Sequence, residues 1–327
     1  MKEEEIRPHV VFTEFLRLCE QDTQTYFADV PRETFNCPAC DTVGNQAFRK
    51  NGFDYALCPR CQTLYVSPRP IASAFSRYYT EAPSVKFWAT TFYHVTAEGR
   101  REKIWKPKAK MIGETMERCG SIKHTVIDIG GGYGIFAEEM ERLTGNPVTV
   151  VEPGPHLAEL CRMRNFRVIE KFMEEVEEQD LPEGPKAFVS FELFEHLHDP
   201  AKFLSHLYNV MHSGDLFLFT TLSGTGVDIQ ALWQDSKSVS PPHHLNFLNP
   251  YSVRILLKRI GLKCLNVTTP GKLDIDILVN NRDKIKDRFW QTFVIQATET
   301  MKEQWQSLIV ASGWSSHMMV CCQKPFT

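Results

Sequence analysis

A short run of branched apolar residues that breaks into glycines is the feature that most constrains the fold of this chain. Val126–Ile129 is followed by Gly130-Gly131-Gly132-Tyr133-Gly134, and a helical pattern begins at Ile135. This succession indicates a strand, a tight turn and the first turn of a helix. Glycines at such a turn leave room for a nucleotide-like ligand beside the backbone N–H groups. The sequence therefore predicts a βα unit with a ligand site at its turn.

A second apolar run, Val148–Val151, ends in Glu152-Pro153. An acidic side chain at the tip of the second strand of such a unit accepts hydrogen bonds from the two hydroxyls of a ribose. Both nicotinamide sites and S-adenosylmethionine (SAM) sites use this arrangement, so the two motifs together indicate an adenosine-containing ligand.

Two details favour SAM over a dinucleotide. Ile135 stands where the dinucleotide fingerprint needs its third small residue, and Asp128 would attract the positive end of SAM but repel a pyrophosphate. At this point the chain resembles the class I SAM-dependent methyltransferases, whose first motif is D-x-G-x-G-x-G. The residues that this resemblance assigns to the cofactor site are Asp128, Gly130, Gly131, Gly132, Tyr133, Gly134, Glu152 and Pro153. A nicotinamide dehydrogenase remains the alternative.

Strands and helices alternate from residue 121 onward, which predicts an α/β fold with a doubly wound, Rossmann-like sheet. We expect strands near 124–129, 147–152, 166–170, 186–191 and 215–221. Two more, near 263–269 and 316–323, would complete the seven-stranded sheet of the class I methyltransferases. The predicted organisation is an N-terminal helix and zinc ribbon (1–70), a helical linker or lid (71–120) and the methyltransferase domain (121–327), with a helical insertion at 272–312.

Two C-x-x-C pairs precede the sheet: Cys37 with Cys40, and Cys58 with Cys61. Four thiolates brought together by two short turns predict a tetrahedral zinc site. A redox pair would need a neighbouring βαβ unit, which is missing here. Four cysteines leave no open coordination position, so we expect a structural zinc ion that does not activate water.

Composition narrows the class of partner. The net charge of -3 and the pI near 6.4 argue against a nucleic acid as the main partner. No apolar run approaches the roughly 18 residues of a membrane span, and the acidic start does not make a signal peptide. The remaining cysteines are scattered. We therefore expect a cytoplasmic protein without a membrane partner.

Aromatic and basic residues are frequent in the predicted lid. In class I methyltransferases the segment before the first strand packs over the cofactor or closes the acceptor pocket. One interpretation is a core stripe with a solvated basic face. The other is that Tyr93, Arg100 and Arg101 hold an anionic acceptor.

The segment after the fourth predicted strand, Ser190–Pro200, resembles the E-H-L-x-D-P segment that is common in these enzymes. The resemblance implies that Phe191 and Glu192 contact the cofactor, and His196 is a further catalytic candidate. A metal site is an alternative on residue type alone, with Glu192, Glu195, His196, His198 and Asp199 as its donors.

Adjacent histidines, His243 and His244, follow the fifth predicted strand and a long loop. Neutral imidazole dominates at pH 7, which makes this loop the best place for a general base. A histidine that packs or caps the next helix is the alternative. The loop resembles the Y-x-E-H-F motif of zinc-ribbon methyltransferases that alkylate nucleotide-bound deoxysugars. His244 matches the motif histidine, whereas His243 and Pro241 replace its glutamate and tyrosine.

Those sugar C-methyltransferases carry a large third domain, for which we expect no room after the core of this chain. Both departures favour O-methylation of a sugar, a nucleotide-sugar or a polysaccharide precursor. The alternatives are a sugar C-methyltransferase, a zinc-containing RNA methyltransferase and a catalytically silent SAM-binding scaffold.

Overall fold

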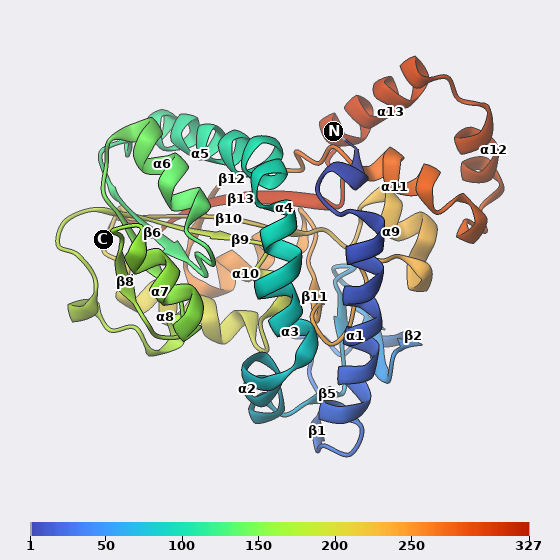
Figure 1. The fold of residues 1–327 in the computed structure, drawn as a ribbon, viewed down its shortest axis with the longest axis horizontal. Coiled ribbons are helices and arrows are strands. Elements are labelled where there is room, and N and C mark those ends of the chain that lie inside the picture. The colour runs from blue at the N-terminus through green and yellow to red at the C-terminus, as the bar shows by residue number, and fades with distance from the viewer. Residues whose placement is uncertain (1, 327) are drawn as a thin grey trace.

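A seven-stranded sheet forms the centre of the computed structural model, which describes residues 2–326 (Figure 1). Its strands are β6 (Thr125–Ile129), β7 (Val148–Val151), β8 (Arg167–Ile169), β9 (Lys186–Phe191), β10 (Leu216–Leu222), β12 (Lys263–Thr268) and β13 (His317–Gln323). Their order is β12-β13-β10-β9-β6-β7-β8, and β13 runs antiparallel to both of its neighbours. Each strand lies within one residue of its predicted bounds, and the class I methyltransferase sheet is confirmed.

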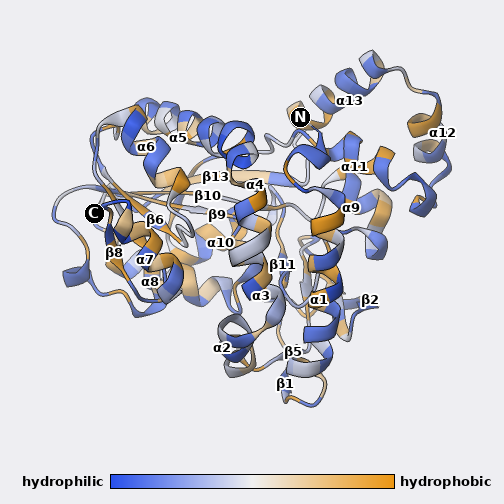
Figure 2. Cartoon of the chain, in the orientation of Figure 1, coloured by the Kyte–Doolittle hydropathy of each residue, from blue (hydrophilic) through white to orange (hydrophobic). Residues whose placement is uncertain are grey.

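Helices cover both faces of this sheet. One face carries α5 (Lys106–Arg118), α6 (Ile135–Thr144) and α7 (Pro155–Met163), and the other carries α8 (Pro200–Val210) and α10 (Ser252–Ile260). Because the central strands are buried on both sides, they are apolar along their length, as β10 is at all its positions except two threonines. Figure 2 shows hydrophilic and hydrophobic residues alternating along α5 and α6, as expected for helices with one buried face.

A smaller sheet lies beside the N-terminal helix α1 (His9–Phe27). It contains β2 (Asn45–Lys50), β3 (Phe53–Leu57), β4 (Leu64–Val66) and β11 (Asn246–Phe247), in the order β11-β4-β3-β2. A two-stranded ribbon of β1 (Arg32–Glu33) and β5 (Arg69–Pro70) flanks it. Three of the four strands come from the predicted zinc ribbon, whereas β11 comes from the segment that follows the paired histidines.

Residues between the small sheet and β6 form a chain of helices. They are α2 (Ala72–Glu81), α3 (Pro83–Phe87), α4 (Tyr93–Arg100) and α5, with the π-helical segments η2 (Trp88–Phe92) and η3 (Arg101–Trp105) between the last three. We call residues 83–105 the lid. Short π-helical segments in a helix are frequent at functional sites.

The predicted insertion is helical, with α11 (Asp274–Asn280), α12 (Arg288–Gln296) and α13 (Glu299–Ala311) packed on α9 (Val227–Leu232). Single-turn helices complete the described chain: η1 (Glu3–Glu5), η4 (Met173–Glu175), η5 (Glu178–Asp180), η6 (Phe194–His196), η7 (Trp233–Asp235) and η8 (Arg282–Lys284). Within residues 2–326, every helix is too short or too polar to cross a membrane.

Candidate active site

The glycine turn between β6 and α6 has a backbone that side chains would obstruct. Gly134 precedes α6 with φ 70°, in the left-handed region that glycine adopts without strain. A Cβ at Gly131 would lie 2.6 Å from Val150 Cγ1 and 3.0 Å from Asp128 Oδ2. The predicted strand, turn and helix are therefore present, and the turn passes directly over the ends of β6 and β7.

Two acids lie at this turn. Glu152 follows β7 and accepts hydrogen bonds from the backbone N–H groups of Gly132 (3.0 Å) and Gly154 (2.9 Å). Asp128 is 2% exposed, and its Oδ2 atom is buried without a hydrogen-bond partner among residues 2–326. Burial, and then the charge of Glu152, raise the pKa of Asp128 to about 7. A buried carboxylate oxygen without a donor fits a positive or hydroxyl-bearing ligand.

A small pocket lies between this turn and the lid. Tyr93 and Trp105 line it from the lid, and Phe191 lines it from the end of β9. Its other lining residues are Asp128, Gly130, Gly131 and Phe136. The ring of Tyr93 stacks on that of Tyr133 with centroids 3.9 Å apart and planes 5° apart. The lid thus contacts the glycine turn directly and encloses the predicted cofactor position with aromatic rings.

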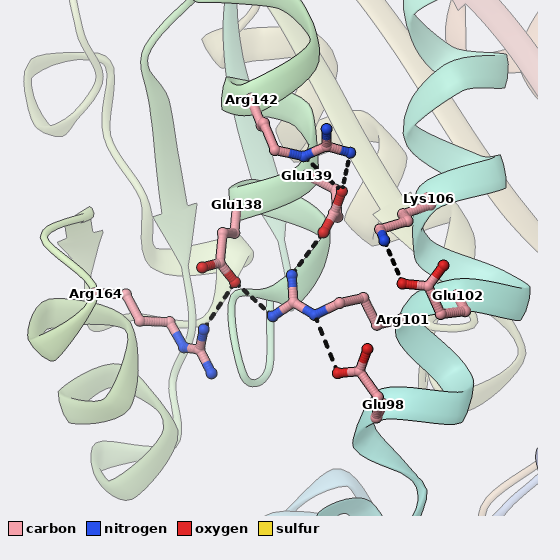
Figure 3. Close-up of polar contacts among 8 residues, drawn as sticks. All are labelled: Glu98, Arg101, Glu102, Lys106, Glu138, Glu139, Arg142 and Arg164. Atoms are coloured by element: carbon pink, nitrogen blue, oxygen red, sulfur yellow. Dashed lines mark hydrogen bonds and ion pairs between the residues drawn. The ribbon is translucent and has the colours of Figure 1, made fainter.

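Arg101 fastens the lid to α6 (Figure 3). Its guanidinium lies 2.6 Å from Glu138 Oε2 and 2.6 Å from Glu139 Oε1, and Arg142 also binds Glu139. The Arg101 guanidinium therefore forms ion pairs with two carboxylates on α6. These ion pairs balance the charge of Arg101 within the lid contact, which disfavours the interpretation of Arg101 as a ligand for an anionic acceptor.

Glu192 lies immediately after β9 with a positive φ of 50°. Its Oε1 atom accepts hydrogen bonds from Lys108 Nζ (2.8 Å) and Thr220 Oγ1 (2.7 Å), and His317 Nδ1 lies 3.4 Å away. Burial alone would raise the pKa of Glu192, but the Lys108 and His317 charges outweigh it and hold that pKa well below its usual range. Glu192 is therefore an ionised carboxylate beside the cofactor cavity.

Lys108 is a further site residue, one that belongs to no motif in the sequence. Lys108 is 7% exposed and lies over the rings of Trp105 and Phe191. One signal was available: Lys108 shares a helical face with Trp105 and Ile112, whereas Lys106 and Lys110 do not.

The three candidate histidines differ in how their ring nitrogens are used. His243 is 8% exposed, and its Nε2 lies 2.7 Å from Tyr78 Oη and 3.3 Å from Cys19 Sγ. His244 has Nδ1 2.6 Å from the carbonyl oxygen of Ser238, so Nδ1–H donates and the lone pair of Nε2 is presented. Within residues 2–326, no residue forms a hydrogen bond with His244 Nε2. Burial lowers the pKa of His244 to about 4 and that of His243 to about 3.

His196 lies beside His244, with ring centroids 4.8 Å apart. Glu195 is 1% exposed and accepts a hydrogen bond from Thr221 Oγ1 at 2.8 Å. The donor atoms of Glu195, His196 and His244 all lie within 4.8 Å of one another, so these three residues could also hold a metal ion.

The wider metal set considered from the sequence does not come together. His198 Nε2 is 2.9 Å from the carbonyl oxygen of Pro70, and Asp199 caps α8 by accepting from Ala201 and Lys202. The side chains of His198 and Asp199 therefore both form hydrogen bonds with backbone groups near them.

The four cysteines of the two C-x-x-C pairs are buried and adjacent. Cys37 and Cys61 have Sγ atoms 3.4 Å apart, as do Cys40 and Cys58, and all four lie within 4.8 Å. A tetrahedral zinc ion with Zn–S bonds of about 2.3 Å requires sulfur separations in this range. The chemistry and placement of these donors fit the predicted zinc site.

The small sheet holds the histidine loop in place. Tyr55 of β3 donates to the carbonyl oxygen of His244 at 2.7 Å, and Val66 N donates to Leu245 O at 2.9 Å. Next to the cysteines, Asn249 Nδ2 donates to Cys61 O at 2.8 Å. The predicted zinc site therefore supports the same loop that presents His244 to the edge of the large sheet.

Two solved structures illustrate the similarity of the fold. An O-methyltransferase from a trans-AT PKS multienzyme of Brevibacillus brevis, in complex with S-adenosyl-L-homocysteine, is 14% identical, with 71% of this chain and 76% of that chain covered and a TM-score of 0.46. A SAM-dependent methyltransferase from Archaeoglobus fulgidus is 15% identical, with 71% and 100% covered and a TM-score of 0.45. No curated protein matches the chain.

The family itself is indicated by the sequence between the lid and β12. Residues 92–267, more than half of the chain, match the profile of a family described as "Methyltransferase domain". This segment contains the glycine turn, Glu152, Glu192 and the paired histidines. The chain belongs to this methyltransferase domain family.

Proposed function

We propose that this protein transfers a methyl group from SAM to a hydroxyl of a small-molecule acceptor, namely a sugar, a nucleotide-sugar or a polysaccharide precursor. One observation carries the proposal. Asp128 Oδ2 and His244 Nε2, which have no hydrogen-bond partner among residues 2–326, and the acid at the tip of β7 all belong to loops or strand ends of one methyltransferase-type sheet.

The cofactor would be held by this chain as follows. Glu152 would accept the ribose hydroxyls, and Asp128 would face the positively charged end. Tyr93, Trp105 and Phe191 would exclude water from the reacting end, because they line the cavity from both sides. Bound SAM supplies a methyl group that its sulfonium already activates. The protein then has to align the acceptor and remove a proton.

His244 is the proposed general base. Its Nδ1–H is held by the carbonyl oxygen of Ser238, which fixes the tautomer that leaves Nε2 able to take a proton. Because burial lowers its pKa to about 4, the imidazole is neutral at pH 7. His196 and His243 would act by positioning the loop, since His243 Nε2 is occupied by Tyr78.

We also propose that zinc in the four-cysteine site is structural, and that the chain is organised as a ribbon (1–70), a linker or lid region (71–120) and a methyltransferase domain (121–327). The lid segment (83–105) lies within the second of these. The hydrogen bonds of Tyr55 and Asn249 support the proposal that the ribbon holds the histidine loop in place.

The first test is calorimetric titration with SAM, S-adenosylhomocysteine (SAH) and NAD in parallel, with zinc counted on the same sample. We expect both adenosyl sulfur compounds to bind and NAD not to bind. Binding of NAD alone, or of none of the three, would reject the proposal.

Replacing Glu152 with alanine should weaken SAM binding by roughly 1 to 3 kcal/mol, because a charged acceptor of two hydroxyl hydrogen bonds is lost. Calorimetry against the wild type measures this change. Glu159→Ala, on the exposed side of α7, is a matched control that should bind normally. An unchanged affinity in Glu152→Ala would remove the ribose assignment.

SAM affinity should fall as the pH is lowered through 7. The carboxyl of Asp128 has its pKa raised to about 7, so below that pH it is protonated and must lose a proton to meet a positive ligand. The affinity should drop by up to about tenfold per pH unit. Asp128→Asn should bind more weakly at pH 8 but lose this slope. If SAM affinity depends on pH in the same way in the wild type and in Asp128→Asn, Asp128 does not face the positive charge of SAM.

A further inference from the structure

Two arginines, one in the lid and one beside it, have Nε atoms without a partner among residues 2–326. Arg100 ends α4 in the lid and Arg7 precedes α1, and the Nε atom of each is buried without a hydrogen bond to these residues. The Arg100 guanidinium lies 5.8 Å from the ring centroid of Tyr93 and 6.0 Å from that of Trp105. Because Tyr93 and Trp105 line the cofactor cavity, Arg100 stands at the boundary of the proposed active site.

The N-terminal segment brings Arg7 to the same place. A Cβ at Gly99 would lie 3.0 Å from the carbonyl oxygen of Glu5, so the backbone before Arg7 packs directly on α4. Lys103 forms an ion pair with Glu5 at 3.1 Å. Glu3 N donates to Asp276 Oδ2 at 2.7 Å, which ties the segment to α11. The position of Arg7 is thus fixed by contacts on both sides.

The two positive charges oppose each other. Burial lowers the pKa of Arg100, and the charge of Arg7 lowers it further. Among residues 2–326, neither guanidinium forms an ion pair with a carboxylate, in contrast to Arg101 with its partners on α6. The nearby carboxylate of Glu192 is bound to Lys108. Two neighbouring cations that form no ion pair are costly even with the carboxylate of Glu192 nearby, and an anion between them would lower that cost.

The charge of Arg7 also acts on His317, although burial is the main cause of the lowered pKa of His317. His317 lies 3.4 Å from Glu192 at the end of β9. Arg100 is thus placed at the lid aromatics by its ring contacts, and Arg7 is placed beside α4 by the backbone contact at Gly99.

We propose that Arg7 and Arg100 bind the phosphate or diphosphate group of the methyl acceptor. The planar N–H forks of two guanidiniums match the several oxygens of a phosphoryl group, and two positive charges match a dianion better than a single carboxylate. This inference rests on the proposed function, because it takes the anion to be part of the acceptor. The sequence suggested Arg100 and Arg101 as ligands of an anionic acceptor, and in this proposal Arg7 takes the place of Arg101.

The test uses inorganic pyrophosphate as the probe and the full chain loaded with SAH. Calorimetric titration at low salt should show binding to the wild type. Arg7→Gln and Arg100→Gln should each weaken pyrophosphate binding by about tenfold or more, because a charge-assisted contact is lost. Arg7→Lys should keep part of the affinity. Arg17→Gln removes an exposed arginine of α1 that pairs with Glu14 and should bind as the wild type does.

SAH binding is measured on every variant and should stay unchanged, which shows that the fold is intact. If Arg100→Gln does not fold, Arg7→Gln decides, because Arg7 lies outside the lid. Equal pyrophosphate affinity in Arg7→Gln and the wild type would overturn the inference, as would SAH binding without any pyrophosphate binding. Failure of SAH to bind would instead reject the proposed function, and pyrophosphate would then be titrated on the unliganded protein.

Discussion

Replacing His244 with alanine is expected to lower the rate of methyl transfer by about a hundredfold or more while SAM binding is kept. The wild-type Nε2 is held ready by the bond from Nδ1–H to Ser238 O. Alanine removes the proton acceptor but leaves the glycine turn, Asp128 and Glu152 in place. The rate is measured with a saturating acceptor, and calorimetry with SAH reports the cofactor site.

The matched control is His212→Ala, which removes an exposed histidine that pairs with Glu178. That variant should retain the full rate. Because burial lowers the pKa of His244 to about 4, the wild-type rate at saturating SAM should persist below pH 6 and fall only as the pH approaches that value. Full activity in His244→Ala would assign the proton to another group, or would mean that the acceptor is already an anion.

Replacing Cys58 with serine should release the zinc ion and abolish most methyl transfer. A structural zinc ion contributes on the order of 10 kcal/mol to the folding of a small zinc-dependent unit. The loss would spread to the histidine loop, because β4 pairs with β11 and Tyr55 holds the His244 carbonyl. We expect zinc content near zero, lower solubility and a larger loss of activity than of SAH affinity.

Cys264→Ser provides the comparison, since Cys264 is a half-buried cysteine of β12 outside the four-cysteine group. Its zinc content and unfolding temperature should match those of the wild type. A wild-type protein that contains no metal and still unfolds at a normal temperature would contradict the zinc assignment.

The strands of the large sheet could be located from the sequence because most of them are buried on both faces. The first core strand shows this, since Val126, Ile127 and Ile129 are all at most 2% exposed and pack into two different clusters. Such a strand is a continuous apolar run, and the glycines at its end leave few alternatives to a βα turn. The cysteine spacing likewise determined that four thiols would meet, whatever the path of the chain between them.

Other parts of the site depend on contacts that local patterns do not contain. In the sequence Lys108 resembles its neighbours Lys106 and Lys110, and only the burial of one face of α5 separates it from them. Arg7 lies outside every motif. The strand β11 has two residues and becomes a strand because β4 is there to pair with it. His243 was a candidate base, yet the approach of α1 and α2 supplies the Tyr78 and Cys19 contacts that occupy it.

The pairing of β11 with β4 also bears on how this protein is made. The chain emerges from the ribosome from its N-terminus, so the cysteines are available to bind zinc long before Asn246 and Phe247 have been synthesised. Until then β4 presents an unpaired edge next to the four cysteines, and pairing it with β11 closes a long loop between Tyr65 and Asn246. The N-terminal ribbon is synthesised first, but it would be among the last parts of the chain to be completed. Its small sheet is finished only when the histidine loop docks and β11 covers the edge of β4.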